Sequence, residues 1–103
     1  MLTREQLKEI LSYDPITGIF TNLKSKGNCR LNERAGTQHK TGYRKIGIAG
    51  KLYYEHQLAW LYMTGKWPRT TMLHINKKKN ENWFDNLLDI PKPEVKKKYF
   101  FQF

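Results

Sequence analysis

Glycine and proline interrupt this chain repeatedly, and they restrict it to short helices and strands. The clearest predicted helix runs from Glu55 to Met63 and carries apolar residues on one face. Gly65 ends that helix and Pro68 prevents it from resuming. A shorter helix is expected over Arg4 to Ser12, because the sequence from Thr3 onward has the spacing of a capping box.

Short strands are expected on both sides of the long helix. Turn residues at Asp14 to Gly18 precede a strand over Ile19 to Leu23. A hairpin is predicted around Ala49-Gly50, with one strand over Tyr43 to Ile48 and the other over Leu52 to Tyr54. Side chains alternate along a strand, so Lys45 faces one side of this hairpin while Arg44, Ile46 and Ile48 face the other. Two further short strands are expected at Met72 to Ile75 and near Leu87 to Ile90.

A length of 103 residues indicates one domain. We expect an α+β domain over residues 1–90, followed by a basic and aromatic tail or short helix over residues 91–103. Cys29 is the only cysteine, so no disulfide within one chain is possible. The sequence also lacks an apolar run of membrane-spanning length and an apolar signal peptide. These features favour a reducing, intracellular setting and argue against a membrane partner.

The net charge of +10 is unevenly distributed. From Thr21 to Lys51 the only acidic residue is Glu33, among many lysines and arginines. A basic surplus in particular segments indicates an anionic polymer as partner, and we expect double-stranded DNA. An ordinary basic surface is the alternative. The residues predicted to contact DNA are Arg34, Arg44, Lys45, Lys51, Lys77, Lys78 and Lys79.

Three ordered segments resemble a known family of nucleases. They are "LSYDPITGIF", "AGTQHKTGYRKIGIAGKLYYEHQLAWLYMTGKWP" and "LHINKKKNENWFDNL". Their order resembles that of HNH endonucleases of the phage-borne, homing-endonuclease-like type, over Leu11 to Ile90. The resemblance implies a basic sheet and helix within residues 1–68, followed by an HNH-like motif with ββα-metal architecture over residues 69–90.

The resemblance also implies roles for individual residues. His74 matches the histidine that acts as general base on water, a role that suits a group titrating near neutrality. Asn86 matches the middle asparagine, which orients that histidine. Asn82 matches an asparagine of the intervening loop, and His56 matches a histidine at the start of the preceding helix. An active member of the family would use Mg²⁺ or Mn²⁺.

The positions at which the family has metal ligands depart from the family pattern. Leu73 stands where the family has a liganding aspartate, and leucine has no oxygen to offer. The segment after Leu87 contains neither Asn nor His within the reach of the usual last ligand. The remaining candidates for metal ligands are Asp85, Asp89 and Glu94. The neighbouring lysines repel a cation and attract phosphate.

Three functions therefore stay open. The first is a DNA-binding protein on an HNH-like scaffold, with weak or no cleavage. The second is an active metal-dependent endonuclease or nickase with His74 as general base. The third is a phage protein that inhibits a host enzyme in the host cytoplasm. A purely structural reading also exists, in which His74 is a hydrogen-bonded strand residue and Asn86 caps a turn.

Overall fold

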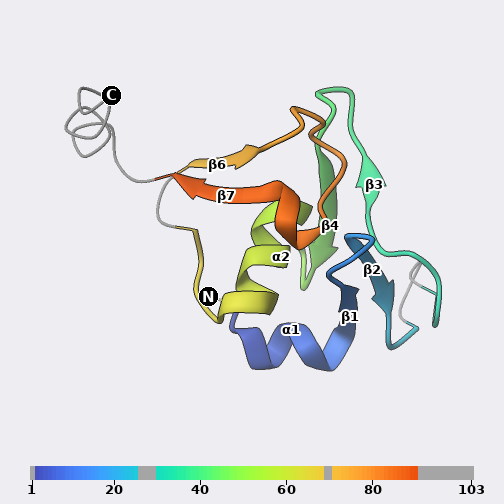
Figure 1. Cartoon of the computed structure of the whole chain (residues 1–103). Coiled ribbons are helices and arrows are strands. Elements are labelled where there is room, and N and C mark those ends of the chain that lie inside the picture. Colours follow the sequence, from blue (N-terminus) through green and yellow to red (C-terminus); the bar gives the residue numbers. More distant parts are fainter. Residues whose placement is uncertain (1, 26–29, 69–70, 91–103) are drawn as a thin grey trace, which may run out of the picture.

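The computed structural model describes residues 2–25, 30–68 and 71–90 (Figure 1). Within these residues, two α-helices, one short 3-10 helix and seven strands follow one another. Their bounds are α1 Arg4–Ile10, β1 Leu11–Asp14, β2 Ile19–Asn22, β3 Thr37–Gln38, β4 Arg44–Ile48, β5 Lys51–Tyr54, α2 Glu55–Thr64, β6 Thr71–His74, η1 Phe84–Asn86 and β7 Leu87–Ile90.

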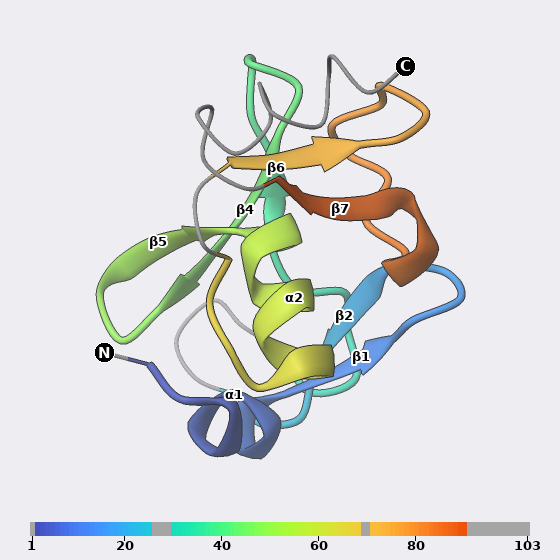
Figure 2. The same ribbon diagram turned by 60° about the vertical axis from the view of Figure 1, so that its left-hand side comes forward.

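The strands form three small antiparallel sheets, β1–β2, β3–β4–β5 and β6–β7. In Figures 1 and 2, helix α2 lies in the middle of the molecule, with α1 below it and β6–β7 above it. Helix α2 contacts α1, β4, β5 and η1. The predicted α+β class with small antiparallel sheets around a helix is confirmed. No helix in the described part of the chain is long and apolar enough to cross a bilayer.

Helix α1 begins as predicted and ends earlier than predicted. The Thr3 hydroxyl accepts a hydrogen bond from the Gln6 backbone N–H at 3.2 Å, and the Thr3 N–H donates to Gln6 Oε1 at 3.0 Å. The helix stops at Ile10 because Leu11–Asp14 forms strand β1, an element that the sequence prediction missed. The predicted helix continued to Ser12 because the apolar residues recur at helical spacing. In the structure, burial alternates along Leu11–Asp14, as in a strand.

Strand β1 is fixed by its turn to β2. Asp14 Oδ1 accepts a hydrogen bond from the Ile16 N–H at 2.9 Å, and the Gly18 N–H donates to the Asp14 carbonyl at 2.7 Å. The turn sets the register Leu11 to Asn22 and Asp14 to Ile19. Asp14 is therefore a turn residue, as its position before proline indicates.

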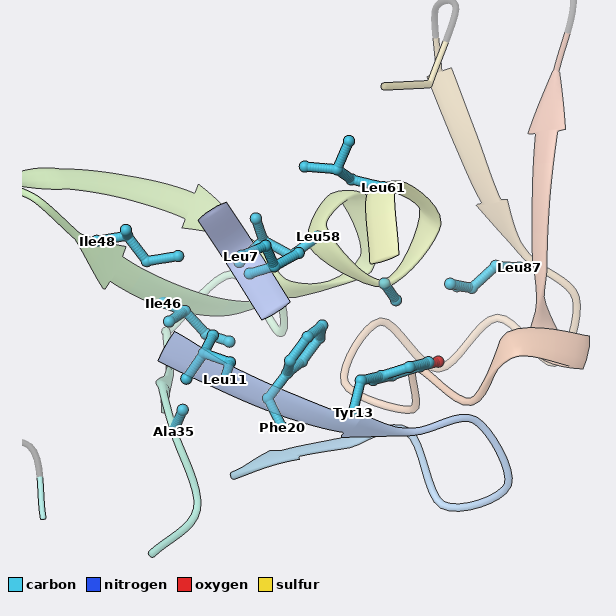
Figure 3. Close-up of a cluster of buried hydrophobic side chains, with 11 residues drawn as sticks. Leu7, Leu11, Tyr13, Phe20, Ala35, Ile46, Ile48, Leu58, Leu61 and Leu87 are labelled. Carbon is cyan, nitrogen blue, oxygen red and sulfur yellow. The ribbon is translucent and has the colours of Figure 1, made fainter. Parts of the chain in front are cut away.

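The core lies between α2 and the inward faces of the sheets (Figure 3). Phe20 is completely buried, and its ring centroid lies 4.6 Å from that of Tyr13. On β4, Ile46 and Ile48 are buried and Gly47 is exposed, which confirms the predicted faces of that strand. The buried apolar residues are Leu7, Leu11, Tyr13, Phe20, Ala35, Ile46, Ile48, Leu58, Ala59, Leu61 and Leu87.

The β6–β7 hairpin closes the described chain. Strand β7 has the predicted bounds, and β6 begins and ends one residue before the predicted strand. Leu73 and Leu88 are directly opposite each other and are 45% and 49% exposed. The predicted tail or short helix over residues 91–103 lies outside the described residues, and the domain boundary at residue 90 stays a prediction.

Candidate active site and nucleic-acid interface

His74 ends strand β6, and its side chain points into the protein. The residue is only 6% exposed, and its backbone pairs with Leu87. Its ring nitrogen Nε2 lies 2.6 Å from Oδ1 of Asn82, which is itself buried. The structure thus brings together the predicted general base and an asparagine that comes from the loop between β6 and η1.

The side chain of Asn86 forms its hydrogen bonds with the loop that follows β6. Its Oδ1 accepts a hydrogen bond from the Asn76 N–H, and its Nδ2 donates to Asn76 Oδ1, both at 3.0 Å. Nδ2 also donates to the Glu81 carbonyl at 2.6 Å. Asn86 therefore ties the two ends of the loop together, and the side chain that holds the His74 imidazole is Asn82. The orienting role that the family resemblance implies for Asn86 stays a prediction.

Behind Asn82 lies the buried carboxylate of Glu55, the first residue of α2. Asn82 Nδ2 donates to Glu55 Oε1 at 2.9 Å, and Glu55 is 0% exposed. Arg44 Nε donates to Glu55 Oε2 at 2.9 Å. A buried charge needs such a partner, because removing it from water is strongly unfavourable. Glu55 was not predicted as a site residue, and only its position beside His56 in the sequence marks it.

Arg44, which the sequence analysis predicts to contact DNA, has a largely buried side chain. Its side chain is 11% exposed, and it also donates to the Ala35 carbonyl at 3.0 Å. Arg44 lies on the same face of β4 as Ile46 and Ile48. Its guanidinium therefore faces the interior, where it forms the ion pair with Glu55. Arg34, which is also predicted to contact DNA, is more accessible than Arg44. Its side chain is 43% exposed, and one of its nitrogens lies 3.7 Å from Glu55 Oε1.

The β1–β2 hairpin supports the backbone of the Asn82 loop. The Tyr13 hydroxyl donates to the Asn82 carbonyl, and the Phe84 N–H donates to the Pro15 carbonyl at 3.0 Å. Burial first, and then the charge of Glu55, raise the pKa of the Tyr13 hydroxyl, so it remains a donor. At Gly18, where φ is +76°, a Cβ atom would lie 2.2 Å from the Trp83 nitrogen. The turn and the loop therefore pack backbone against backbone.

A second histidine, His56, lies beside His74 in a group of aromatic rings. The two imidazole centroids are 5.1 Å apart, and the Tyr43 and Tyr54 rings lie 5.4 and 5.3 Å from His56. In the described part of the chain, His56 Nδ1 is buried without a hydrogen-bond partner. Burial, followed by the proximity of His74, lowers the pKa of His56 to about 4. His56 is therefore neutral at physiological pH.

Two lysines lie on the outer side of this aromatic group. Lys79 Nζ lies 4.8 Å from the Tyr43 ring centroid, and Lys45 Nζ lies 5.1 Å from that of Tyr54. Such cation–π contacts hold an ammonium in place while it stays accessible. The other lysines predicted to contact DNA, Lys51, Lys77 and Lys78, are exposed. Lys78 Nζ lies 3.9 Å from a carboxylate oxygen of Glu81.

The residues described by the structure do not fit a divalent-cation site. They contain no group of three histidine, cysteine or acidic side chains placed to hold a metal ion. Leu73 is exposed at the position before His74. Asp85 is exposed on η1, and Asp89 lies opposite Met72 in the β6–β7 hairpin. Glu94, the remaining candidate ligand, lies outside the described residues.

Comparison with known proteins relates the fold of this chain to a solved structure. No family model matches the chain, and no match is found among curated proteins. Among solved structures, the chain is similar to the HNH homing endonuclease I-HmuI, in a structure described as showing its DNA binding and cleavage, with a TM-score of 0.62 and 19% identity. The match covers 90% of this chain and 53% of that one, so this chain spans about half of that protein's length. At this level of identity the likeness concerns the fold, and this chain has a fold similar to that of an HNH endonuclease.

Proposed function

We propose that this protein binds double-stranded DNA on an HNH-like scaffold and cleaves it weakly or not at all. The observation that carries the proposal is the placement of Lys45 and Lys79 on tyrosine rings beside His56 and His74. Ammonium groups held in this way bind phosphates, because each contact releases condensed counterions from DNA. The likeness to a DNA-binding endonuclease supports DNA as the polyanion.

The residues next to His74 support the proposal of weak or absent cleavage. Leu73 supplies no oxygen, and the described acidic residues do not gather around the imidazole. Lys79 lies on the Tyr43 ring, which is 6.3 Å from His74, and its charge opposes the binding of a divalent cation there. The same charge favours a bound phosphate. A site of this composition is better suited to holding DNA than to cutting it.

The test is the salt dependence of DNA binding by three lysine variants. Lys45→Gln and Lys79→Gln should each lower the slope of log affinity against log salt by about 0.9, if each lysine neutralises one phosphate. Lys8→Gln is the matched control, because Lys8 also has a cation–π contact, 5.1 Å from the Tyr62 ring centroid. Lys8 belongs to α1, which lies below α2 in Figure 1. Slopes unchanged in the first two variants would refute the proposed interface, and binding without salt dependence would favour a protein partner.

A metal-dependent DNA endonuclease or nickase is the second candidate function. The observation that favours it is the hydrogen-bonded chain from His74 through Asn82 to Glu55, which holds the imidazole in one orientation. A supercoiled-plasmid assay with Mg²⁺, Mn²⁺ or EDTA separates the two functions. Nicking that requires metal and disappears in His74→Ala would establish the nuclease. Retardation without nicking would establish DNA binding alone.

A further inference from the structure

The carboxylate of Glu55 determines which side-chain atom of Asn82 donates a hydrogen bond and which accepts one. Glu55 is buried as an ion pair with Arg44, whose Nε lies 2.9 Å from Oε2. An ionised carboxylate only accepts hydrogen bonds. The Asn82 atom that lies 2.9 Å from Glu55 Oε1 must therefore be the amide nitrogen, which donates. The amide oxygen of Asn82 then faces the other way, toward His74.

This direction determines which nitrogen of the neutral imidazole carries the proton. Asn82 Oδ1 lies 2.6 Å from His74 Nε2 and can only accept, so Nε2 must donate. The lone pair of the neutral ring is then on Nδ1. We propose that Glu55, acting through Asn82, is a positioning residue that fixes the tautomer of His74, with the proton on Nε2 and the lone pair on Nδ1.

The consequence is a defined proton acceptor. With Nε2 engaged by Asn82, Nδ1 is the atom of His74 that is able to accept a hydrogen bond from water or from a ligand hydroxyl. Reversing the tautomer would turn that acceptor into a donor without moving the ring. The inference goes beyond DNA binding and is tested on the free protein, so its failure would leave the proposed function intact.

The decisive experiment is ¹⁵N NMR of the histidine side chains, read where His74 is neutral and assigned by comparison with His74→Gln. The wild-type protein should carry the proton on Nε2. In Glu55→Gln the new amide should turn its oxygen to Arg44, which only donates, and its nitrogen to Asn82. Asn82 must then rotate and present its own nitrogen to His74, and the proton should move to Nδ1. A folded Glu55→Gln protein that keeps the proton on Nε2 would overturn the proposal, as would a wild-type protein protonated on Nδ1.

A second variant covers the case in which Glu55→Gln does not fold. Asn82→Leu removes the acceptor at similar volume, and exchange of the His74 Nε2 proton with water should accelerate on the order of tenfold, the factor associated with one net hydrogen bond. Asn80→Leu is the control, because Asn80 lies in the same loop and bonds Gln38 at 3.1 Å. Equal exchange in Asn82→Leu and Asn80→Leu would contradict the assignment of the Nε2 proton to Asn82.

Discussion

Acid should destabilise this protein through His56. The pKa of this buried side chain is about 4 in the folded chain, against an ordinary value of 6.5. The unfolded chain therefore takes up a proton at higher pH than the folded chain does. The stability contributed by neutral His56 is fully present above about pH 6.5, and it is lost as the pH falls through that value toward 4.

The size of the effect follows from the same two values. A difference of one in pKa corresponds to about 1.4 kcal/mol, so a pKa of about 4 rather than 6.5 corresponds to about 3 kcal/mol of unfolding free energy. For a protein of 103 residues this is a large share of a total stability of roughly 5–15 kcal/mol.

Urea denaturation followed by tryptophan fluorescence from pH 7 to pH 4 measures this loss. Carboxylates also titrate in that range, so the informative quantity is the difference between the wild-type protein and His56→Phe. The wild type should lose about 3 kcal/mol more than the variant. His39→Gln is the matched control and should keep the wild-type profile. Identical profiles for wild type and His56→Phe would refute the reasoning, because they would mean that folding does not perturb His56.

Three further substitutions test the packing and the site. Arg44→Met should lower the unfolding free energy by about 3 kcal/mol, because it takes the closest cation from a buried carboxylate, whereas Lys45→Met should change it by less than about 1 kcal/mol; urea denaturation compares them. Gly18→Ala should destabilise by more than Gly50→Ala: both glycines have positive φ, which opposes alanine by about 1–2 kcal/mol, but only at Gly18 does the added Cβ meet backbone within 3 Å. Equal melting temperatures would contradict that packing. Leu73→Asp should be tolerated within about 0.5 kcal/mol, since Leu73 is 45% exposed, and should increase Mn²⁺ binding measured by calorimetry; unchanged Mn²⁺ binding would mean that more than one ligand is missing.

Local signals were read correctly from the sequence. The capping box at Thr3, the hairpin around Ala49-Gly50 and the bounds of β7 depend on residues within a few positions of one another. Strand β1 was missed because its alternation covers only four residues and follows directly on a helix. Its identity as a strand depends on its pairing with β2 across the turn.

The sequence names His74 as a candidate site residue but does not reveal the hydrogen bonds around it. Asn82 was matched only to a loop asparagine, and the carboxylate of Glu55 behind it was not predicted. Glu55 and Asn82 are 27 positions apart, and a hydrogen bond over that distance leaves no periodic pattern. Arg44 was predicted to contact DNA because the sequence does not show that it pairs with a buried carboxylate, that of Glu55.

The support that the β1–β2 hairpin gives to the Asn82 loop also bears on how the protein folds. Tyr13 and Asn82 are 69 positions apart, and contacts of such separation close late because the loop entropy must be overcome first. An isolated two-stranded hairpin is marginally stable at best, so the hairpin and the loop that it contacts should become ordered together. We therefore expect the surroundings of His74 to be completed late in folding. Refolding kinetics measured at this loop should report the slowest structural step in the molecule.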